Sequence, residues 1–368
     1  YNDIPAGHDL SFFAEDYFTL PVSTHTLEIQ AGVRASSLLN LPKAYKLHNK
    51  FYFDPRVNMK WLFPAFFIGD QKLSYEIGGG IGWHSMMPSL TQLYPNLLYE
   101  DIIQLNYYHN NPAYRRLQMI TYIIDRTNPD LSAARNFKWE IRGNITYAEN
   151  NLSVTYFKEN MTSGFRTGTR LLPLAYKTYD NNSIDATTLD GPPDLSQMTY
   201  TQDTLMCIYG ITTNGTKLRK TGVEFQFSSK RIPALATRIT ISGAVYSNSQ
   251  GYYESSTKII NNRRLPYVGW YTDPDGYIRK SFNTNFMFDT HIPNLKLGFS
   301  LSAQCLWFSN QQTEWKSGIP EYYIDSQGNS YPYTEESSQD MYLQWLKKSY
   351  NEALFDRRIS EAFNVNFN

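Results

Sequence analysis

Long segments in which apolar and polar side chains alternate one by one recur along the whole chain of 368 residues. In residues 27–36, for example, Leu27, Ile29, Ala31 and Val33 alternate with polar or small residues. A period of two places the two sets on opposite faces of a β-strand, whereas a helix needs a period of 3.6. We expect eleven strands, near residues 8–20, 24–36, 54–63, 72–86, 135–148, 151–165, 216–229, 236–249, 279–291, 295–309 and 357–368.

The connections between these strands alternate strictly between short and long. The short ones are residues 21–23, 64–71, 149–150, 230–235 and 292–294. The long ones are about residues 37–53, 87–134, 166–215, 250–278 and 310–356. Loops beyond ~12–15 residues are uncommon in compact domains, whereas outer-membrane barrels have tight turns at one end and long loops at the other. We therefore predict an all-β fold, an antiparallel up-and-down transmembrane β-barrel, rather than a soluble sandwich.

Composition excludes several other classes of protein. The 34 basic and 34 acidic side chains give zero formal net charge, and a chain without a basic excess is not expected to bind nucleic acid. No stretch approaches the ~20 apolar residues of a transmembrane helix, and the longest apolar run, residues 61–68, is interrupted by Pro64. Cys207 and Cys305 are too few for a disulfide framework or a zinc site, so we expect two unpaired thiols.

If the apolar faces meet lipid, the opposite faces line the barrel interior and carry charges of both signs. These residues are Glu28, Arg34, Arg56, Lys60, Glu76, Lys138, Glu140, Arg142, Glu224, Arg238, Asp289 and Lys296. An Arg or Lys on the lipid face at mid-bilayer would cost ~2–4 kcal/mol. Mixed signs favour an interior packed against a polar plug over a charge-selective pore. The solvated face of an ordinary sheet is the alternative.

One expected strand has three glycines on its interior face. Glycine in a strand leaves room for the close approach of another backbone, or it marks a bulge or bend. No Lys-Ser or Lys-Thr follows, so the run is not a phosphate-binding loop. We expect plug contact here, with strand bending as the alternative. The residues predicted to contact a plug are Gly78, Gly80, Gly82, Glu140, Arg142 and Glu224.

The long loops are rich in tyrosine and tryptophan. Such side chains offer rigid amphipathic area to ligands such as sugars or peptides, and they can equally pack the loops against one another. The candidate ligand-binding residues are Tyr107, Tyr108, Tyr114, Trp315, Tyr322 and Tyr323. In the last loop, apolar residues at helical spacing predict a surface helix within residues 338–357.

Motifs of catalysis and metal binding are not found in the sequence. The six histidines form no HExxH pair, and there is no GxSxG, Walker or EF-hand motif. Acidic clusters at residues 273–276 and 333–336 could hold a calcium ion only weakly. We therefore predict that the protein is not an enzyme and that it has no catalytic residue, no cofactor and no metal site.

Several stretches resemble the barrel of TonB-dependent outer-membrane receptors of Gram-negative bacteria. The resemblance covers most strands and few loops, and the order and spacing of the motifs carry it. The motifs are residues 10–16 (LSFFAED), 27–34 (LEIQAGVR), 54–60 (DPRVNMK), 83–89 (WHSMMPS), 93–95 (LYP), 128–140 (NPDLSAARNFKWE) and 221–225 (TGVEF).

The resemblance implies a barrel of 22 strands with a plugged lumen. Residues 1–368 would then be part of one barrel domain in the outer membrane, with the plug and the closing strands outside this sequence. It also implies contact with membrane lipid and active uptake of a bulky extracellular nutrient, driven by the TonB complex through the plug. The nutrient would be a glycan or peptide received with a surface lipoprotein, as in the SusC-like type, or a siderophore or cobalamin. A passive porin and a surface adhesin are the alternatives.

Overall fold

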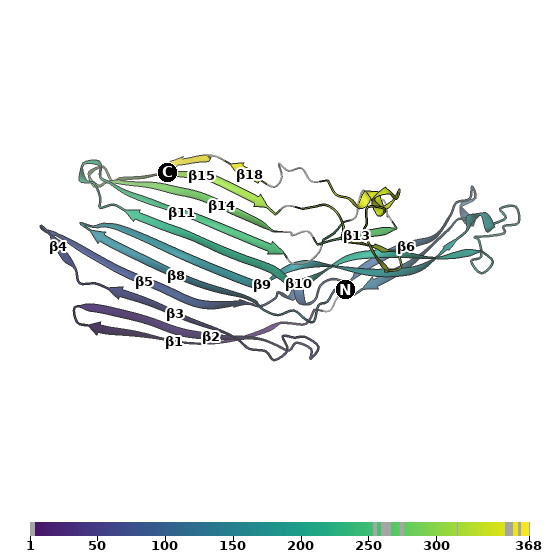
Figure 1. Ribbon diagram of the computed structural model, residues 1–368, viewed down its shortest axis with the longest axis horizontal. Coiled ribbons are helices and arrows are strands. Elements are labelled where there is room, and N and C mark those ends of the chain that lie inside the picture. Colours follow the sequence, from purple (N-terminus) through teal and green to yellow (C-terminus); the bar gives the residue numbers. More distant parts are fainter. Residues whose placement is uncertain are drawn as a thin grey trace.

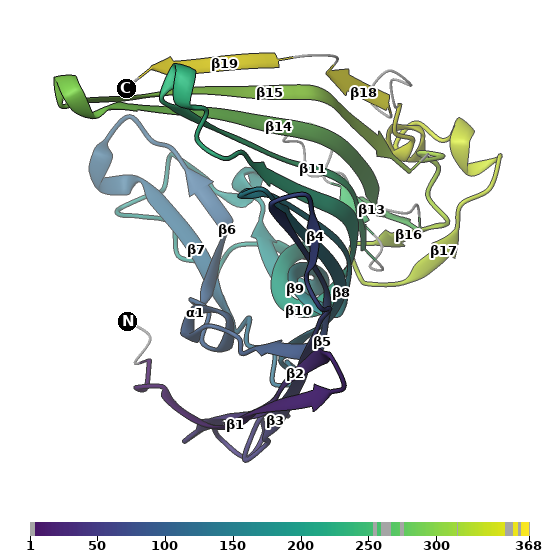
Figure 2. The same cartoon turned by 90° about the vertical axis from the view of Figure 1, so that its left-hand side faces the viewer.

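The computed structural model describes residues 4–252, 256–258, 266–272, 276–314, 316–349, 356–359 and 362–367. Its largest feature is a strongly curved antiparallel sheet (Figures 1 and 2). The strands of this sheet are β1 (His8–Val22), β2 (His25–Leu39), β3 (Tyr52–Leu62), β4 (Phe66–Ile68), β5 (Gln71–Met86), β8 (Ala134–Tyr147), β9 (Asn150–Tyr179), β10 (Tyr200–Ser228), β11 (Thr237–Tyr252), β14 (Tyr277–Ile292), β15 (Leu297–Thr313), β18 (Asp356–Ile359) and β19 (Ala362–Phe367).

The strands follow one another in the sheet in the order of the sequence. The order is β1-β2-β3-β5-β8-β9-β10-β11-β14-β15-β18, with β4 also paired to β5 and β19 to β15. All eleven predicted strands are present, the last divided into β18 and β19. The all-β, antiparallel, up-and-down prediction is confirmed. Among the described strands, β1 pairs only with β2, and β18 and β19 only with β15, so the sheet is open at both edges.

Tight turns join the strands at one end of the sheet, on the left in Figure 1. Ala148 and Glu149 both have positive φ (47° and 68°) between β8 and β9, as a two-residue type I′ hairpin requires. The 3₁₀ turns η3 (Pro233–Leu235) and η4 (Pro293–Leu295) are each followed by a left-handed residue. In η4 that residue is Lys296 (φ 52°). Its predicted place on the interior face of a strand is therefore wrong, because it closes a turn.

The long connections gather at the other end, where β9 and β10 run past the rest of the sheet (Figure 1). These two strands have 30 and 29 residues. The loops form a hairpin, a small sheet and short helical turns. The elements are β6 (Leu98–Tyr107), β7 (Arg116–Ile124), β12 (Ser256–Lys258), β13 (Tyr267–Tyr271), β16 (Tyr322–Asp325), β17 (Ser330–Pro332), α1 (Leu90–Leu93), η1 (Pro112–Tyr114), η2 (Asn181–Ser183), η5 (Ser337–Gln339) and η6 (Leu343–Leu346).

The surface helix predicted within residues 338–357 is wrong for the described part of that segment. Instead, 3₁₀ turns η5 and η6 follow one another. The Asp340 carboxylate accepts hydrogen bonds from the backbone N–H groups of Tyr342 (2.8 Å) and Leu343 (3.0 Å). These bonds start a second turn instead of continuing the first. Residues 350–355 lie outside the described residues. No helix in the described segments has the length and apolar character to cross a membrane.

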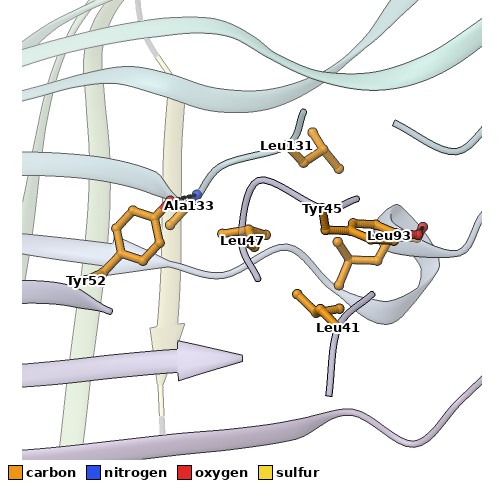
Figure 3. Close-up of a cluster of buried hydrophobic side chains, with 7 residues drawn as sticks. All are labelled: Leu41, Tyr45, Leu47, Tyr52, Leu93, Leu131 and Ala133. Atoms are coloured by element: carbon orange, nitrogen blue, oxygen red, sulfur yellow. Dashed lines mark hydrogen bonds between the residues drawn. The ribbon is translucent and has the colours of Figure 1, made fainter. Parts of the chain in front are cut away.

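Two long connections, residues 37–53 and 87–134, share a small hydrophobic core at the loop end of the sheet (Figure 3). Tyr45 donates a hydrogen bond through its hydroxyl to the Leu93 carbonyl (3.0 Å), and Tyr52 accepts one from the Ala133 N–H (3.2 Å). Burial raises the pKa of the Tyr45 hydroxyl, so it stays protonated as a donor. These loops are therefore a packed body. The residues of the core, named the loop core below, are Leu41, Tyr45, Leu47, Tyr52, Leu93, Leu131 and Ala133.

Candidate functional site

One face of the large sheet is apolar and exposed. The pairing register joins Ile141, Tyr156, Val223, Val245 and Phe282 into one row across β8, β9, β10, β11 and β14. The first four of these side chains are exposed, by 37–54% of their surface. A row of this kind is what the predicted alternation places on one side of the sheet. The row defines the apolar face.

The opposite face is polar, and most of the charges on its β1–β8 half neutralise one another. Lys60 Nζ lies 3.1 Å from a Glu76 carboxylate oxygen and 3.8 Å from one of Glu28. Lys138 Nζ lies 2.8 Å from a Glu140 oxygen. Exposed pairs like these contribute little to stability, but each satisfies a charge within the sheet itself. This side of the sheet is the polar face.

The three predicted glycines lie on the polar face of β5. Gly78, Gly80 and Gly82 pair regularly with β3 and β8 without a register shift, so they do not mark a bulge. A Cβ at Gly80 would lie 2.5 Å from the Asn58 side-chain oxygen, and one at Gly82 would lie 2.9 Å from the Arg56 Cβ. Glycine here thus gives room for side chains of β3 to lean over β5.

A hollow of about 300 Å³ opens above these glycines, named the glycine hollow. Gly80, Gly82 and Glu140 line it, whereas Gly78 does not. Sequence reasoning missed His84 and Asn136 as lining residues, although both stand at polar-face positions of their strands. The full lining is Arg56, Asn58, Gly80, Ile81, Gly82, Trp83, His84, Asn136, Lys138 and Glu140.

A second hollow of about 330 Å³ lies on the polar face of β9–β14, around Glu224. Its other lining side chains are neutral hydroxyls, amides and small or apolar groups, so Glu224 is the only charge in it. The lining is Ser153, Thr155, Glu224, Phe225, Gln226, Ser242, Gly243, Ala244, Asn283 and Asn285. We name it the Glu224 hollow.

No described group forms an ion pair with Arg142 or Glu224, two residues of opposite charge that were predicted to contact a plug and lie on β8 and β10, the strands on either side of β9. Arg142 opposes Thr155 on β9, and Thr155 opposes Glu224 on β10. Two strand spacings separate the two residues, about 10 Å. Both side chains are exposed. The polar face thus presents one positive and one negative charge that could bind a partner carrying the complementary pair.

The loop tyrosines predicted to bind ligand fall into two separate groups. Three of them lie at the tip of the β6–β7 hairpin. There the His109 ring lies between Tyr107 and Tyr114, with ring centroids 6.4 and 5.1 Å away. The Arg115 guanidinium lies 4.3 Å from the ring centroid of Tyr108, a cation–π contact. His109 and Arg115 were not predicted from the sequence, because only the tyrosines were considered there.

The second group lies on the small sheet of β13, β16 and β17. Tyr322 stacks on Trp270, with ring centroids 5.8 Å apart. Tyr323 contacts Tyr267 at 5.4 Å and Tyr331 at 5.3 Å. Much of each ring therefore faces another ring, as expected if the aromatics pack the loops together. Trp315, the sixth predicted residue, lies outside the described residues.

Hydrogen bonds fix the edge of this aromatic group. The Asp325 carboxylate accepts from the Gln327 and Asn329 N–H groups (2.9 and 2.8 Å) and from the Tyr331 hydroxyl (3.3 Å). Partial burial works to raise the pKa of Asp325, but hydrogen bonds from Asn329 and Gln327 outweigh it and lower the pKa. Burial, and then the charge of Asp325, raise the pKa of Tyr331. The Asp325 carboxylate therefore bonds to groups of its own loop.

Metal-binding geometry is not found in the described part of the chain. There, no three His, Cys, Asp or Glu side chains are close enough to share an ion. Residues 273–275 of one predicted acidic cluster lie outside that part. Cys207 and Cys305 do not form a disulfide bond with each other, as predicted. Comparisons with models of protein families, with curated proteins and with solved structures find no match to this chain.

Proposed function

We propose that the chain forms part of the barrel of a TonB-dependent outer-membrane transporter, which takes up a bulky nutrient through a plugged lumen. The observation that carries the proposal is a single up-and-down sheet with an exposed apolar face, a charged polar face, tight turns at one end and long loops at the other. These are the features of outer-membrane barrels. In the barrel, further strands would pair with β1 and with β19.

The apolar face supports a location in lipid. Soluble monomers rarely expose contiguous apolar patches larger than a few hundred Å², whereas the row through Ile141 and Val245 crosses five strands. Strand length points the same way. A 16-residue strand such as β11 is about 53 Å long at ~3.3 Å per residue, and a tilt of ~45° leaves enough to cross a ~30 Å hydrocarbon core. Lipid would cover this face.

The polar face supports a lumen that holds a plug. The Glu224 hollow is bounded by side chains of four successive strands, as happens on the inner side of a curved sheet. Charges of the β1–β8 half are largely paired within the sheet, while Arg142 and Glu224 form no ion pair with a described residue. A polar plug would supply a carboxylate to Arg142 and a basic group to Glu224, and its backbone could approach the glycine hollow.

The loop end supports a receptor for extracellular ligand. The loop core holds two connections in place, and a second buried cluster, of Ile102, Ile124, Leu174 and Cys207, fixes the β6–β7 hairpin whose tip carries three of the candidate tyrosines. We propose a glycan or peptide nutrient, delivered with a surface lipoprotein, as the first candidate and a siderophore or cobalamin as the second. Aromatic rings serve each of these ligands through their faces and edges.

The test measures uptake of candidate nutrients by cells expressing the full-length protein, with and without a working energy-coupling complex. We expect uptake to require the complex. Uptake that is unchanged without the complex, together with a steady open conductance in planar bilayers, would instead identify a passive porin. Binding to cells or glycans without any uptake would identify an adhesin. Either result would overturn the transporter.

A further inference from the structure

The β6–β7 hairpin is held rigidly against the extended part of β9 and β10. Ile102 and Ile124 of the hairpin form a buried cluster with Leu174 of β9 and Cys207 of β10. The Tyr122 hydroxyl donates a hydrogen bond to the carbonyl of Ala175. One face of the hairpin is thus packed against β9 and β10, and the hairpin needs no partner to keep its shape.

The other face of the same hairpin is largely apolar and exposed, with one hydrogen-bonded polar pair, Asp101 and Thr121, in its middle. Tyr99 opposes Ile123, and Ile103 opposes Met119, so these side chains are neighbours across the two strands. Single apolar residues at a surface are common, but a contiguous group marks an interaction site. The exposed residues are Tyr99 (57%), Ile103 (53%), Leu117 (58%), Met119 (44%) and Ile123 (63%).

One edge of the hairpin carries unpaired backbone. β7 pairs only with β6 among the described strands, and β6 is the strand that lies against β9 (Figure 2). Residues 117–124 contain no charged residue, no proline and no glycine. Natural edge strands are protected by such residues, since an exposed apolar edge recruits other strands. The register shift at Ile103–Leu105 is on β6 and leaves the β7 edge regular.

We propose that the edge of β7 captures an extended, uncharged polypeptide segment of a partner as an additional strand. The partner strand would bond to the free backbone of β7 and place every second side chain, an apolar one, beside Leu117, Met119 and Ile123. This is recognition by strand addition. Because residues 117–124 carry no charge, we expect the partner segment to be uncharged as well.

The size of the surface favours a single strand over a second copy of the protein. Nine residues of β7 extend over about 30 Å, and two strands lie ~4.8 Å apart, so the exposed face covers only about 300 Å². A stable protein–protein interface needs ~800 Å² on each partner. Backbone hydrogen bonds along the strand would supply the affinity that so small an apolar area lacks.

The probe is a nine-residue peptide of alternating threonine and valine, acetylated, amidated and extended by two lysines for solubility. Its binding to the full-length protein in detergent is measured by fluorescence anisotropy, and hydrogen exchange follows the amides of β7. We expect saturable binding and slower exchange at residues 116–124. The same peptide with every amide N-methylated cannot donate backbone hydrogen bonds, so we expect at least tenfold weaker binding.

Two matched variants separate the edge from the face. Ile123→Lys places a charge beside the incoming strand, and we expect it to weaken peptide binding at least tenfold. Ile103→Lys places the same charge on the same exposed face, but on the inner strand β6, and we expect less than a twofold change. The proposal would be overturned if the peptide did not bind, or if the N-methylated peptide bound equally well. It would also be overturned if the two variants had equal effects, or if the β7 amides were already protected from exchange without peptide.

Discussion

Single residues on the polar face test whether the space above β5 is used. A Cβ at Gly80 would clash only with the end of the movable Asn58 side chain and would lie at ordinary contact distance from Glu140 Cγ, so Gly80→Phe should fold while filling the glycine hollow. We expect uptake to fall at least tenfold with normal heat-modifiable migration on gels. The control is Gly143→Phe, because a Cβ at Gly143 meets nothing within 4 Å and points to the apolar face. Equal uptake by the two variants would show that the glycine hollow has no role in uptake.

The two free charges give a second prediction at this scale. We expect Arg142→Ala and Glu224→Ala to loosen the plug, seen as new ion conductance of the full-length protein in planar bilayers. Their stability should change by less than about 1 kcal/mol, because neither charge is paired within the sheet. Lys60→Ala is the control, since Lys60 pairs with Glu28 and Glu76 within the sheet and does not line the glycine hollow. If neither variant gave new ion conductance, the proposed contact of Arg142 and Glu224 with a plug would be wrong.

At the scale of elements, the loop core is the feature that most affects the loops. Leu47 is 1% exposed, and truncating a buried leucine costs ~2–5 kcal/mol. We expect Leu47→Ala to accelerate hydrogen exchange in residues 40–51 and 125–133 at least tenfold while the large sheet exchanges as before. Leu90→Ala, at an exposed leucine nearby, should leave exchange unchanged. Acceleration spread over the whole sheet would mean that the loops are not a separate unit.

Elements also show what sequence could and could not predict. The strands of the large sheet were predictable because one face is exposed and apolar and the other polar, which makes the period of two visible, as between Ile141 and Arg142. The β6–β7 hairpin was missed because apolar side chains stand on both its faces. Ile120 and Ile123 lie on opposite faces, so alternation disappears. The loop core was missed because its residues come from two connections and, within the second, from segments about 40 residues apart.

The candidate site was predictable only in part, for the same physical reason. Alternation assigned Gly80, Glu140 and Glu224 to the polar face, and each lines a hollow there. Whether a charge is paired often depends on neighbours in other strands: Glu76 of β5 has Lys60 of β3, whereas Glu224 has no described partner. Trp270 and Tyr267, which contact Tyr322 and Tyr323, come from β13, about fifty residues earlier, and nothing local in the sequence identifies them.

At the scale of the whole molecule, the decisive question is which solvent meets the apolar face. Val223 and Ala244 are close in space, on neighbouring strands β10 and β11, but they lie on opposite faces of the sheet. If lipid covers the apolar face, Val223→Lys should cost ~2–4 kcal/mol near mid-bilayer. Ala244→Lys, beside the free carboxylate of Glu224, should cost less than about 1 kcal/mol.

The measurement is reversible unfolding in urea of the full-length protein inserted in phosphatidylcholine vesicles, followed by tryptophan fluorescence. The same pair of variants distinguishes the two environments by the size of the stability change. In water, a lysine at Val223 would replace an exposed apolar side chain by a solvated one, and stability would change little while solubility would rise. A protein whose Val223→Lys variant is as stable as wild type would therefore not be a membrane barrel, whatever the alternation of its strands, because only lipid makes a charge on that face costly.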